Sequence, residues 1–463
     1  MPDVLIASAK APIPIRALDE AAFAALKDAP LQALAQTHRF KAKRGELLLV
    51  SAANGKLTSV VLGLGKPENA DAMIARGLPP RLPAGDYALE ARKGGPEPAL
   101  FALGWALGSY AFDRYRKRED KPRPRLVAPK GCDLDEVIHI AHACALARDL
   151  VNTPAQDMGP LQIETVAREI AQAHGAKLDV VTGDDLIDAG YPAVHAVGRA
   201  ATQARAPRFL ELTWNARKKT LPRLVLVGKG VVFDSGGLDL KSAAGMRQMK
   251  KDMGGGAHAL ALARMVMQAN LPVRLSVLVP VVENAVSGDA FRPGDVLSSR
   301  KGLTIEIGNT DAEGRLILAD ALARANELEP DLTIDFATLT GAARVALGPQ
   351  LPPFYTHDDA LAAQIAKASV TQADPVWRMP LWSGYRDAID SEIADVRNDS
   401  AEWAQAGSLT AALFLERFAP EKGSWVHFDI FAWNPRARPG WPAGAEAQAI
   451  RAVYAVLKQR YSA

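Results

Sequence analysis

The feature that most constrains the fold of this chain is a regular alternation of strand-like and helical runs in its C-terminal two thirds. Four runs are rich in Val, Leu and Ile without strict polar alternation, which is typical of strands covered on both faces. They are Arg223–Val227, Arg274–Val282, Leu332–Ala337 and Trp425–Phe431. Helical runs at Gly256–Ala269, Arg315–Leu328 and Leu409–Phe418 separate them. This order predicts an α/β fold with a central mixed sheet and helices on both of its faces.

The first 130 residues show the pattern of a second, smaller α/β unit. Glu46–Val50 and Ser59–Leu64 are short apolar runs of the strand type, and Pro98–Phe112 has apolar and small residues at helical spacing. A chain of 463 residues is also too long for one ordinary domain. We therefore expect two domains.

An amphipathic helix is predicted between the two units, over Leu134–Val151. Its apolar residues form one stripe, and the chain then runs into Asn-Thr-Pro, where the residue before proline disfavours the helical conformation. We predict a linker helix within residues 131–155. The N-terminal α/β domain would then cover residues 1–130, and the larger domain residues 156–463.

The composition narrows the class of protein. Hydrophobic residues make up 48% and charged residues 23% of the chain, which is typical of a globular protein with a sizeable core. The formal net charge of +3 is too small to indicate a nucleic acid partner. The two cysteines, Cys132 and Cys144, lack the spacing of a zinc or redox motif and favour a reduced compartment. We see neither a signal peptide nor a long apolar run, and we expect a cytoplasmic location without a membrane span.

A basic stretch from Arg114 to Pro129 leaves one alternative open. It holds seven arginines and lysines against Glu119 and Asp120. We favour a solvated boundary segment, because charge runs usually face water and no nucleic-acid motif accompanies this one. The alternative is a DNA-binding or scaffold role through the N-terminal domain, which a salt-dependent shift of duplex DNA would reveal.

Three segments of the larger domain carry charged residues next to glycines. In the first, Val227–Gly237, the strand-like run leads into Lys229 and Asp234. Their odd separation would point them to opposite faces of a regular strand, but Gly228 and Gly230 permit a bulge that brings both to one side. Taken alone, the segment is also explained by a lysine on the surface and an aspartate in a turn, without any shared site.

The second segment contains Lys241, and Asp252 just before a glycine triplet. A carboxylate at the start of a helix is favoured by the helix dipole. Considered alone, Asp252 is most simply interpreted as a charge that stabilises the start of a helix. Lys241 is most simply interpreted as a surface residue.

The third segment is the octapeptide Asn309–Leu316, at the change from a strand-like to a helical run. It places Asp311, Glu313 and Arg315 at alternate positions. In an extended chain these three side chains would share one face.

Taken together, these acids are numerous enough to form one site. Asp234, Asp252, Asp311 and Glu313 offer sufficient oxygen ligands for two divalent cations, which would activate a water and polarise a carbonyl group. Zn, Mg and Mn all accept carboxylates. A lysine binds metal only as the neutral amine, whereas Arg315 keeps its charge and is an anion binder. The sequence predicts a two-metal hydrolytic site; a phosphoesterase is the weaker interpretation because such sites usually use histidines.

The three segments resemble the motifs of the leucyl (cytosol) aminopeptidase family of dinuclear metallopeptidases. Asn309–Leu316 matches that family's signature, and Val227–Gly237 and Met249–Gly255 resemble its other metal segments. Further similar stretches are 147–154, 337–342 and 409–415, so the resemblance covers most of residues 145–430. It implies a catalytic domain at residues 156–463 and a homohexamer that removes leucine-like N-terminal residues from peptides.

The resemblance also implies a metal-binding role for five residues. Asp234 and Glu313 would each contact both ions, Zn or Mn. Asp311 would bind one ion through its carboxylate and its backbone carbonyl. Lys229 and Asp252 would complete the shell of the other ion.

Further roles follow from the resemblance. Lys241 would direct its ammonium group at the substrate carbonyl oxygen and stabilise the intermediate. Arg315 would hold a bicarbonate ion, which acts as the general base. Met249, Thr338 and Gly341 would line the pocket for the first side chain of the substrate.

Three features differ from the family pattern. Asp239 is an additional acid, which we expect to face solvent rather than pair with Lys241. His258 follows the glycine triplet, and we expect a neutral, packed histidine there. The run Ala432–Ala445 departs from the family's glycine-rich ending and affects the shape of the pocket.

Overall fold

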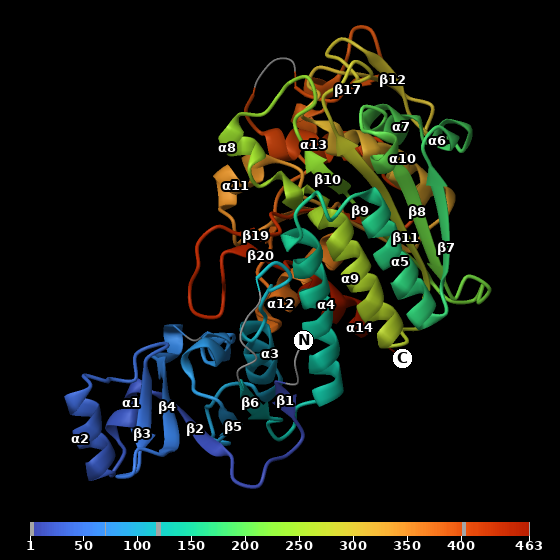
Figure 1. The fold of residues 1–463 in the computed structure, drawn as a ribbon. Coiled ribbons are helices and arrows are strands. Elements are labelled where there is room, and N and C mark those ends of the chain that lie inside the picture. Colours follow the sequence, from blue (N-terminus) through green and yellow to red (C-terminus); the bar gives the residue numbers. More distant parts are fainter. Residues whose placement is uncertain (1–3, 70, 117–121, 401–403, 463) are drawn as a thin grey trace. The chain divides into compact units, whose positions relative to one another are not determined.

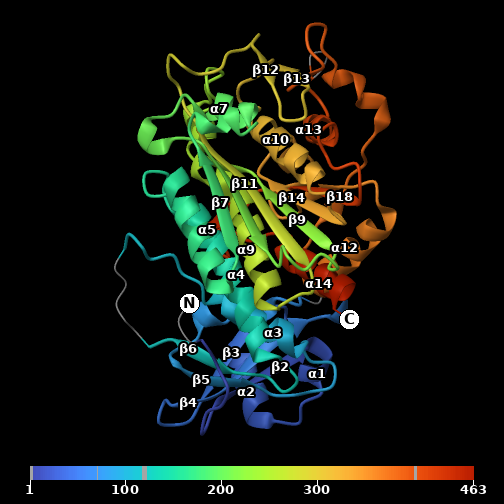
Figure 2. The same cartoon turned by 90° about the vertical axis from the view of Figure 1, so that its right-hand side faces the viewer.

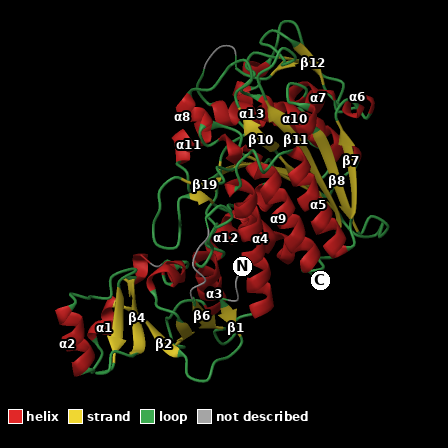
Figure 3. Ribbon diagram, viewed as in Figure 1, coloured by secondary structure: helices red, strands yellow, loops and turns green. Residues whose placement is uncertain are grey.

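The structure is a computed structural model that describes residues 4–69, 71–116, 122–400 and 404–462. Its contacts divide the chain into two compact units, and both contain helices and strands, which confirms the predicted α/β class (Figures 1 and 3). Unit 1 comprises Met1–Ala145 and Arg436–Ala443, and unit 2 comprises Leu146–Pro435 and Gly444–Ala463. Helix α4 (Leu134–Asn152) crosses the division between Ala145 and Leu146, so the predicted domain boundaries stay predictions. In the described part of the chain, no helix is long and apolar enough to cross a membrane.

Unit 1 is built on a six-stranded sheet of order β1-β6-β5-β2-β4-β3. All neighbouring strands are parallel except the edge pair β3 and β4, which is antiparallel. The strands are β1 (Leu5–Ile6), β2 (Ile13–Asp19), β3 (Leu47–Ser51), β4 (Leu57–Gly65), β5 (Gly85–Leu89) and β6 (Pro124–Val127). The helices are α1 (Glu20–Ala24), α2 (Ala29–Thr37), α3 (Pro98–Gly108) and α4 (Leu134–Asn152). The predicted strands near residues 47 and 59 and the helices at 98 and 134 are therefore confirmed.

Helix α3 ends at Gly108, earlier than the predicted Phe112, where it meets the backbone of Arg76. A side chain at Gly108 would place its Cβ 2.0 Å from the Arg76 carbonyl oxygen, so only glycine allows this approach. Arg76 is buried, donates from Nε to the Gly440 carbonyl at 2.8 Å, and stacks 4.5 Å from the Trp441 ring. These contacts hold the C-terminal segment Arg436–Ala443 within unit 1.

Unit 2 contains a mixed sheet of order β16-β15-β18-β14-β9-β11-β8-β7, with β10 paired to β11. The four predicted strands are its four central, mutually parallel members: β9 (Arg223–Gly228), β11 (Arg274–Asn284), β14 (Leu332–Ala337) and β18 (Ser424–Asp429). The other strands of the sheet are β7 (Lys177–Thr182), β8 (Arg208–Trp214), β10 (Gly230–Asp234), β15 (Pro353–Tyr355) and β16 (Trp377–Arg378). Short strands outside it are β12 (Val296–Ser298), β13 (Thr304–Glu306), β17 (Val396–Arg397), β19 (Trp433–Asn434) and β20 (Gly444–Ala445).

Helices cover both faces of this sheet, as predicted (Figure 2). One layer contains α5 (Pro160–His174), α9 (Gly254–Gln268) and α14 (Ile450–Tyr461), and the other contains α7 (Pro192–Gly198), α10 (Glu313–Glu327) and α13 (Gly407–Glu416). The remaining helices are α6 (Asp185–Asp188), α8 (Ala243–Met246), α11 (Gly341–Leu347) and α12 (Asp359–Thr371). Side chains of β9 alternate between the layers: Val225 and Val227 pack into the cluster with α10 and α13. Each predicted helix of the sheet crossovers begins two residues earlier than expected.

The glycine triplet at the start of α9 brings this helix into backbone contact with the sheet. Lys229 N donates to the Phe336 carbonyl at 3.0 Å, and Gly256 N donates to the Lys229 carbonyl at 2.7 Å. A Cβ atom at Gly255 would lie 2.0 Å from Phe336 O, so a side chain there would push the helix off the strands. The glycines thus permit the close packing on which the geometry around Lys229 depends.

His258 is a neutral histidine packed inside α9, as expected from the sequence. The ring is fully buried; Nδ1 lies 2.6 Å from the Gly254 carbonyl, and Nε2 accepts a hydrogen bond from Gln448 N at 3.0 Å. This network fixes the tautomer with the proton on Nδ1. Burial lowers the pKa of His258 to about 4.

We predict that His258 makes the protein acid-sensitive. Its folded-state pKa lies below the unfolded value of about 6.5, so the stability it supports is present above pH 6.5 and is lost as the pH falls toward 4. The size of this loss is about 3 kcal/mol. Denaturant unfolding between pH 8 and 4 should show a flatter pH dependence for His258→Gln than for the wild type. His38→Gln, at an exposed position, is the control, and parallel curves for wild type and His258→Gln would contradict the prediction.

Candidate functional site

The polar side chains of the site lie where the parallel strands of unit 2 end. Lys229 follows β9, Asp234 ends β10, Asn284 ends β11 and Thr338 follows β14. Strand β9 lies between β11 and β14 in the sheet, so the two central strands that follow β9 in the sequence are added on opposite sides of it. Open α/β sheets place their ligand sites at the carboxyl ends of strands, at such a change of direction.

The backbone after β9 is irregular, as predicted, but the shift of register lies within β10 and not at Gly228 or Gly230. Lys229 separates β9 from β10, and the pairing of β10 with β11 shifts register between Val231 and Phe233. The irregularity brings Lys229 and Asp234 to the lining of one cavity, although five residues separate them.

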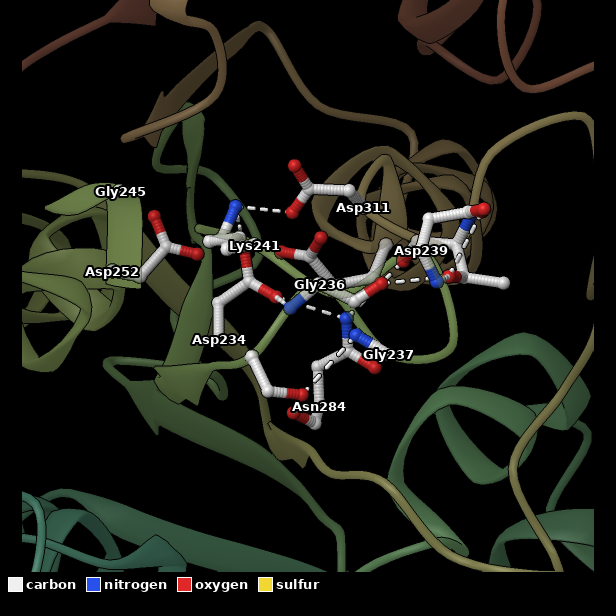
Figure 4. A network of polar contacts seen from close by, with 12 residues as sticks. Asp234, Gly236, Gly237, Asp239, Lys241, Gly245, Asp252, Asn284 and Asp311 are labelled. Carbon is white, nitrogen blue, oxygen red and sulfur yellow. Dashed lines mark hydrogen bonds and ion pairs between the residues drawn. The ribbon is translucent and has the colours of Figure 1, made fainter. Parts of the chain in front are cut away.

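Three carboxylates form a buried cluster. Oxygen atoms of Asp234, Asp252 and Glu313 all lie within 4.8 Å of one another, and these residues are only 2%, 2% and 1% exposed. They come from β10, from the 3-10 helix η5 (Met249–Met253) and from the first turn of α10. Figure 4 shows Asp234 and Asp252 together with Lys241 and Asp311.

Lys229 is a buried amine between two of these carboxylates. Its Nζ atom lies 2.7 Å from Asp252 Oδ2 and 2.9 Å from Glu313 Oε1. Burial lowers the pKa of Lys229, but the two acids outweigh it and hold this pKa above its usual value. Burial and the neighbouring Asp234 raise the pKa of Glu313 well above its usual value. The three acids therefore outnumber the amine that lies between them, although Lys251 Nζ also lies 3.4 Å from Asp252 Oδ1.

Lys241 pairs with the remaining acids. Its Nζ atom lies 2.8 Å from Asp234 Oδ2 and also pairs with Asp311 Oδ1. Asp234 Oδ1 accepts hydrogen bonds from Gly236 N at 2.8 Å and from Asn284 Nδ2 at 2.9 Å. Burial, and after it Asp234, raise the pKa of Asp311 to about 6. Asp311 is the most exposed of the four acids and faces the cavity.

These residues fit a pair of divalent cations. Asp252 Oδ2 and Glu313 Oε1 are buried and accept no directed hydrogen bond, although Lys229 lies at ion-pair distance from both. A buried carboxylate oxygen without a donor is costly, and a metal ion satisfies it without a directed hydrogen bond. The donor set consists of carboxylate oxygens and amines, which Zn and Mn both accept.

A cavity of about 390 Å³ borders the carboxylates. Nine of the ten site residues predicted from the sequence line it: Lys229, Asp234, Lys241, Met249, Asp252, Asp311, Arg315, Thr338 and Gly341. The tenth, Glu313, is buried and contacts Lys229. The structure brings all ten residues together, and their individual roles stay predictions.

The extended conformation that would place Asp311, Glu313 and Arg315 on one face is absent. Helix α10 begins at Glu313, and Ala312 precedes it with φ −105° and ψ 39°. The chain is therefore not extended over residues 311–315, and side chains two apart do not share a face. Glu313 reaches the cluster from the first turn of the helix, and Asp311 from the loop before it.

Arg315 is a buried cation on the same helix turn. Its Nη1 atom donates to the Asn398 carbonyl at 2.6 Å, and its Nε atom is buried without a hydrogen bond. Burial lowers the pKa of Arg315 to about 10, so the group stays charged at neutral pH. A buried cation with a spare donor at a cavity is suited to an anion.

Asp239 and the run Ala432–Ala445, which both depart from the family pattern, lie outside the carboxylate cluster. Asp239 is exposed, as expected, and it does not pair with Lys241; its Oδ2 atom accepts from Thr310 N at 2.7 Å and Thr310 Oγ1 at 3.1 Å. It thereby holds the residue before Asp311. No described residue of the run Ala432–Ala445 lines the cavity, and an effect of this run on the shape of the pocket stays a prediction.

Some supporting residues escaped sequence reasoning. Asn284 contacts both Asp234 and the Thr310 carbonyl, the latter at 3.1 Å. Thr338, predicted only as a pocket residue, donates its hydroxyl to Asp252 Oδ1 at 2.9 Å. A polar residue at the carboxyl end of an apolar strand was the available signal for Asn284.

Asp429, the last residue of β18, fixes the loop that follows β14. Its buried carboxylate accepts hydrogen bonds from Leu339 N at 3.0 Å, Thr340 N at 3.1 Å, Thr340 Oγ1 at 2.6 Å and Ser408 Oγ at 3.1 Å. The same loop carries Thr338, whose hydroxyl contacts the carboxylate cluster. Asp429 therefore supports the site from the next strand of the sheet.

Together, the fold and the site define a hydrolase of the α/β class, with a centre of carboxylates and lysines that is suited to two metal ions. Residues 145–454 match the model of the cytosol aminopeptidase family, catalytic domain, and residues 13–129 match that of the M17 aminopeptidase N-terminal domain. The chain belongs to the cytosol aminopeptidase family and is an aminopeptidase, a hydrolase.

Individual relatives agree with this assignment. A probable cytosol aminopeptidase of Syntrophotalea carbinolica is 39% identical over 450 residues, which cover 91% of this chain and 90% of the relative. The crystal structure of cytosol aminopeptidase from Coxiella burnetii superposes with a TM-score of 0.92 at 43% identity, covering 99% of this chain and 100% of that one. The bottromycin maturation enzyme BotP in complex with Mn gives a TM-score of 0.86 at 32% identity and covers 97% and 100%.

These comparisons do not support the alternative of a DNA-binding or scaffold role. The basic stretch that suggested it, Arg114–Pro129, lies partly outside the described residues, which omit 117–121. The whole N-terminal region at residues 13–129 matches the aminopeptidase N-terminal domain instead.

We predict that Asp429→Asn weakens the site without removing a metal ligand. The amide keeps one acceptor oxygen but loses the one that Thr340 Oγ1 and Ser408 Oγ use, so stability should fall by about 1–3 kcal/mol. The looser loop should also weaken metal binding by about tenfold. Thermal unfolding and a metal titration test both effects. Asp359→Asn, at an exposed surface ion pair, is the control, and unchanged metal affinity in Asp429→Asn would contradict the supporting role.

Proposed function

We propose that this aminopeptidase uses two divalent metal ions to remove leucine-like N-terminal residues from peptides. The observation that carries the proposal is the buried cluster of Asp234, Asp252 and Glu313, whose oxygens lie within 4.8 Å of one another beside a cavity. The manganese complex of the relative BotP supports a divalent ion. Zn and Mn are both compatible with the donor set.

Five residues would hold the ions. Asp234 and Glu313 would contact both, Asp311 would bind one with its carboxylate and backbone carbonyl, and Lys229 and Asp252 would complete the other. When bound, two such ions lower the pKa of a water and polarise the scissile carbonyl. Lys229 would serve as the neutral amine, which requires the loss of the proton that its acidic neighbours now favour.

Lys241 and Arg315 would supply charge to the reaction. The Lys241 ammonium lines the cavity and would stabilise the negative charge that develops on the substrate carbonyl oxygen. The buried Arg315 guanidinium, with its unpaired Nε, would hold a bicarbonate ion that accepts the proton of the water. Met249, Thr338 and Gly341 would contact the first side chain of the substrate.

We further propose a homohexamer in the cytoplasm. The names of the relatives, cytosol aminopeptidases, support the location. Large apolar side chains exposed on unit 2 support assembly, among them Val345 at 90%, Ile393 at 65% and Trp382 at 59% exposure. Sedimentation analysis would give six times the mass of the 49.5 kDa chain.

We predict that a chelator abolishes hydrolysis of leucine p-nitroanilide and that Mn or Zn restores it. The reason is that the two ions would lower the pKa of a bound water and polarise the scissile carbonyl, which the acids alone do not do. Activity and bound metal should fall and recover together when the protein is dialysed and then reloaded. Full activity in protein shown to be free of metal would overturn the two-metal proposal.

We predict that Glu313→Gln lowers both metal content and kcat. The amide cannot bridge two cations as a carboxylate does, so kcat should fall by at least about 100-fold and bound metal by about one ion per chain. Elemental analysis of the purified variant measures the metal, and circular dichroism verifies the fold. Glu392→Gln, at an exposed position of the same unit, is the matched control. Wild-type metal content in Glu313→Gln would exclude Glu313 as a ligand.

A further inference from the structure

Two basic side chains line the cavity but have no part in the proposed reaction, Lys251 and Arg344. They come from different segments, η5 and α11. Both lie over the ring of Phe431: Lys251 Nζ is 5.5 Å and Arg344 Cζ is 4.6 Å from its centroid. The two cations therefore occupy the same part of the cavity.

This part of the cavity is the proposed pocket for the first side chain. Lys251 lies two residues after Met249 in η5, and Arg344 lies three residues after Gly341, the first residue of α11. A methyl group added to Gly341 would lie 3.6 Å from Arg344 Nη2. The guanidinium therefore borders the space that a substrate side chain would enter.

Arg344 keeps hydrogen-bond donors available for a ligand. Its Nη1 atom donates to the Thr340 carbonyl at 2.7 Å, and one face of the group packs on Phe431. Among the described residues, no carboxylate forms an ion pair with it. The described acids that line the cavity are already paired with other cations: Asp252 with Lys229 and with Lys251, Asp234 and Asp311 with Lys241, and Asp399 with Arg397. Lys251 therefore adds positive charge beside Arg344, and Arg344 supplies the donors that remain available.

We propose that Arg344, with Lys251 beside it, forms a carboxylate-binding subsite in this pocket, so that the enzyme cleaves N-terminal glutamate and aspartate as well as apolar residues. The guanidinium presents a planar set of donors that matches a carboxylate. An uncharged side chain of the same shape, such as that of glutamine, gains no ion pair there. The inference rests on the proposed aminopeptidase function and adds a substrate class to it.

The test compares glutamyl, glutaminyl and leucyl p-nitroanilides with the metal-loaded, full-length enzyme. These substrates have no C-terminal carboxylate, so any effect of charge comes from the first side chain. We expect kcat/KM of the wild type to be about tenfold or more higher for the glutamyl than for the glutaminyl substrate. Arg344→Met should remove this advantage and leave leucyl hydrolysis within about twofold.

Two further variants distinguish recognition of the substrate carboxylate by Arg344 from an effect of the total charge of the protein and from an effect on the structure of the loop. Arg217→Met removes an exposed arginine that does not line the cavity, and it should retain the preference for glutamate. Arg344→Lys keeps a cation and should retain part of the preference, although a lysine lacks the planar fork. A loop defect alone would instead lower kcat/KM for all three substrates together.

The outcomes distinguish this inference from the proposed function. Equal kcat/KM for glutamyl and glutaminyl substrates, with normal leucyl hydrolysis, would overturn the subsite and leave the aminopeptidase function intact. An equal loss for all three substrates in Arg344→Met would also overturn it. If metal-loaded wild type cleaves none of the three, both the proposed function and the subsite fail.

Discussion

The burial of several carboxylates beside one another is the constraint on which the rest of the centre depends. An unpaired buried charge costs several kcal/mol, so the fold has to bring opposite charges to the same place. Lys229 lies between Asp252 and Glu313, and Lys241 lies between Asp234 and Asp311. Lys251 is a third amine, 3.4 Å from Asp252 Oδ1, but three amines do not balance four acids, and the pKa of Glu313 stays well above its usual value because of burial and the neighbouring Asp234. The protein alone thus leaves an excess of acid that cations would relieve.

The acids meet only because the backbone of three segments comes unusually close. Lys229 exchanges backbone hydrogen bonds with both Phe336 of β14 and Gly256 of α9. Gly255 has no space for a side chain against the Phe336 carbonyl. The glycine triplet is therefore a condition for the site although it binds nothing itself, and a larger residue there would separate Asp252 from Lys229.

The central strands and the crossover helices were predictable because their burial on both faces leaves a continuous apolar pattern. Eight of the ten site residues were predictable because they occur in three compact motifs, and the other two, Thr338 and Gly341, because the stretch 337–342 also resembles the family. The starts of the helices were less predictable. Helix α10 begins at Glu313 and not at the predicted Arg315, and no sign of this is visible in the sequence because the N-cap residue is Ala312 and not Ser, Thr or Asp. Asp429 and Asn284 are single polar residues at strand ends, and only the register of the sheet shows that they support the site. Segment Arg436–Ala443 joins unit 1 through Arg76, a contact between residues far apart in sequence.

The same sheet that positions the acids also fixes the charge of the pocket. Asp429, at the end of β18, binds the backbone and hydroxyl of Thr340, and the Thr340 carbonyl in turn accepts from Arg344. The guanidinium is thus linked to a central strand through two consecutive hydrogen-bonded steps. A side chain held in this way loses little conformational freedom when it binds a ligand, which favours recognition by preorganisation. Lys229 and Asp234 lie at strand ends of this sheet, and Arg344, the residue proposed for selectivity, is held through Thr340 to Asp429 at the end of another of its strands.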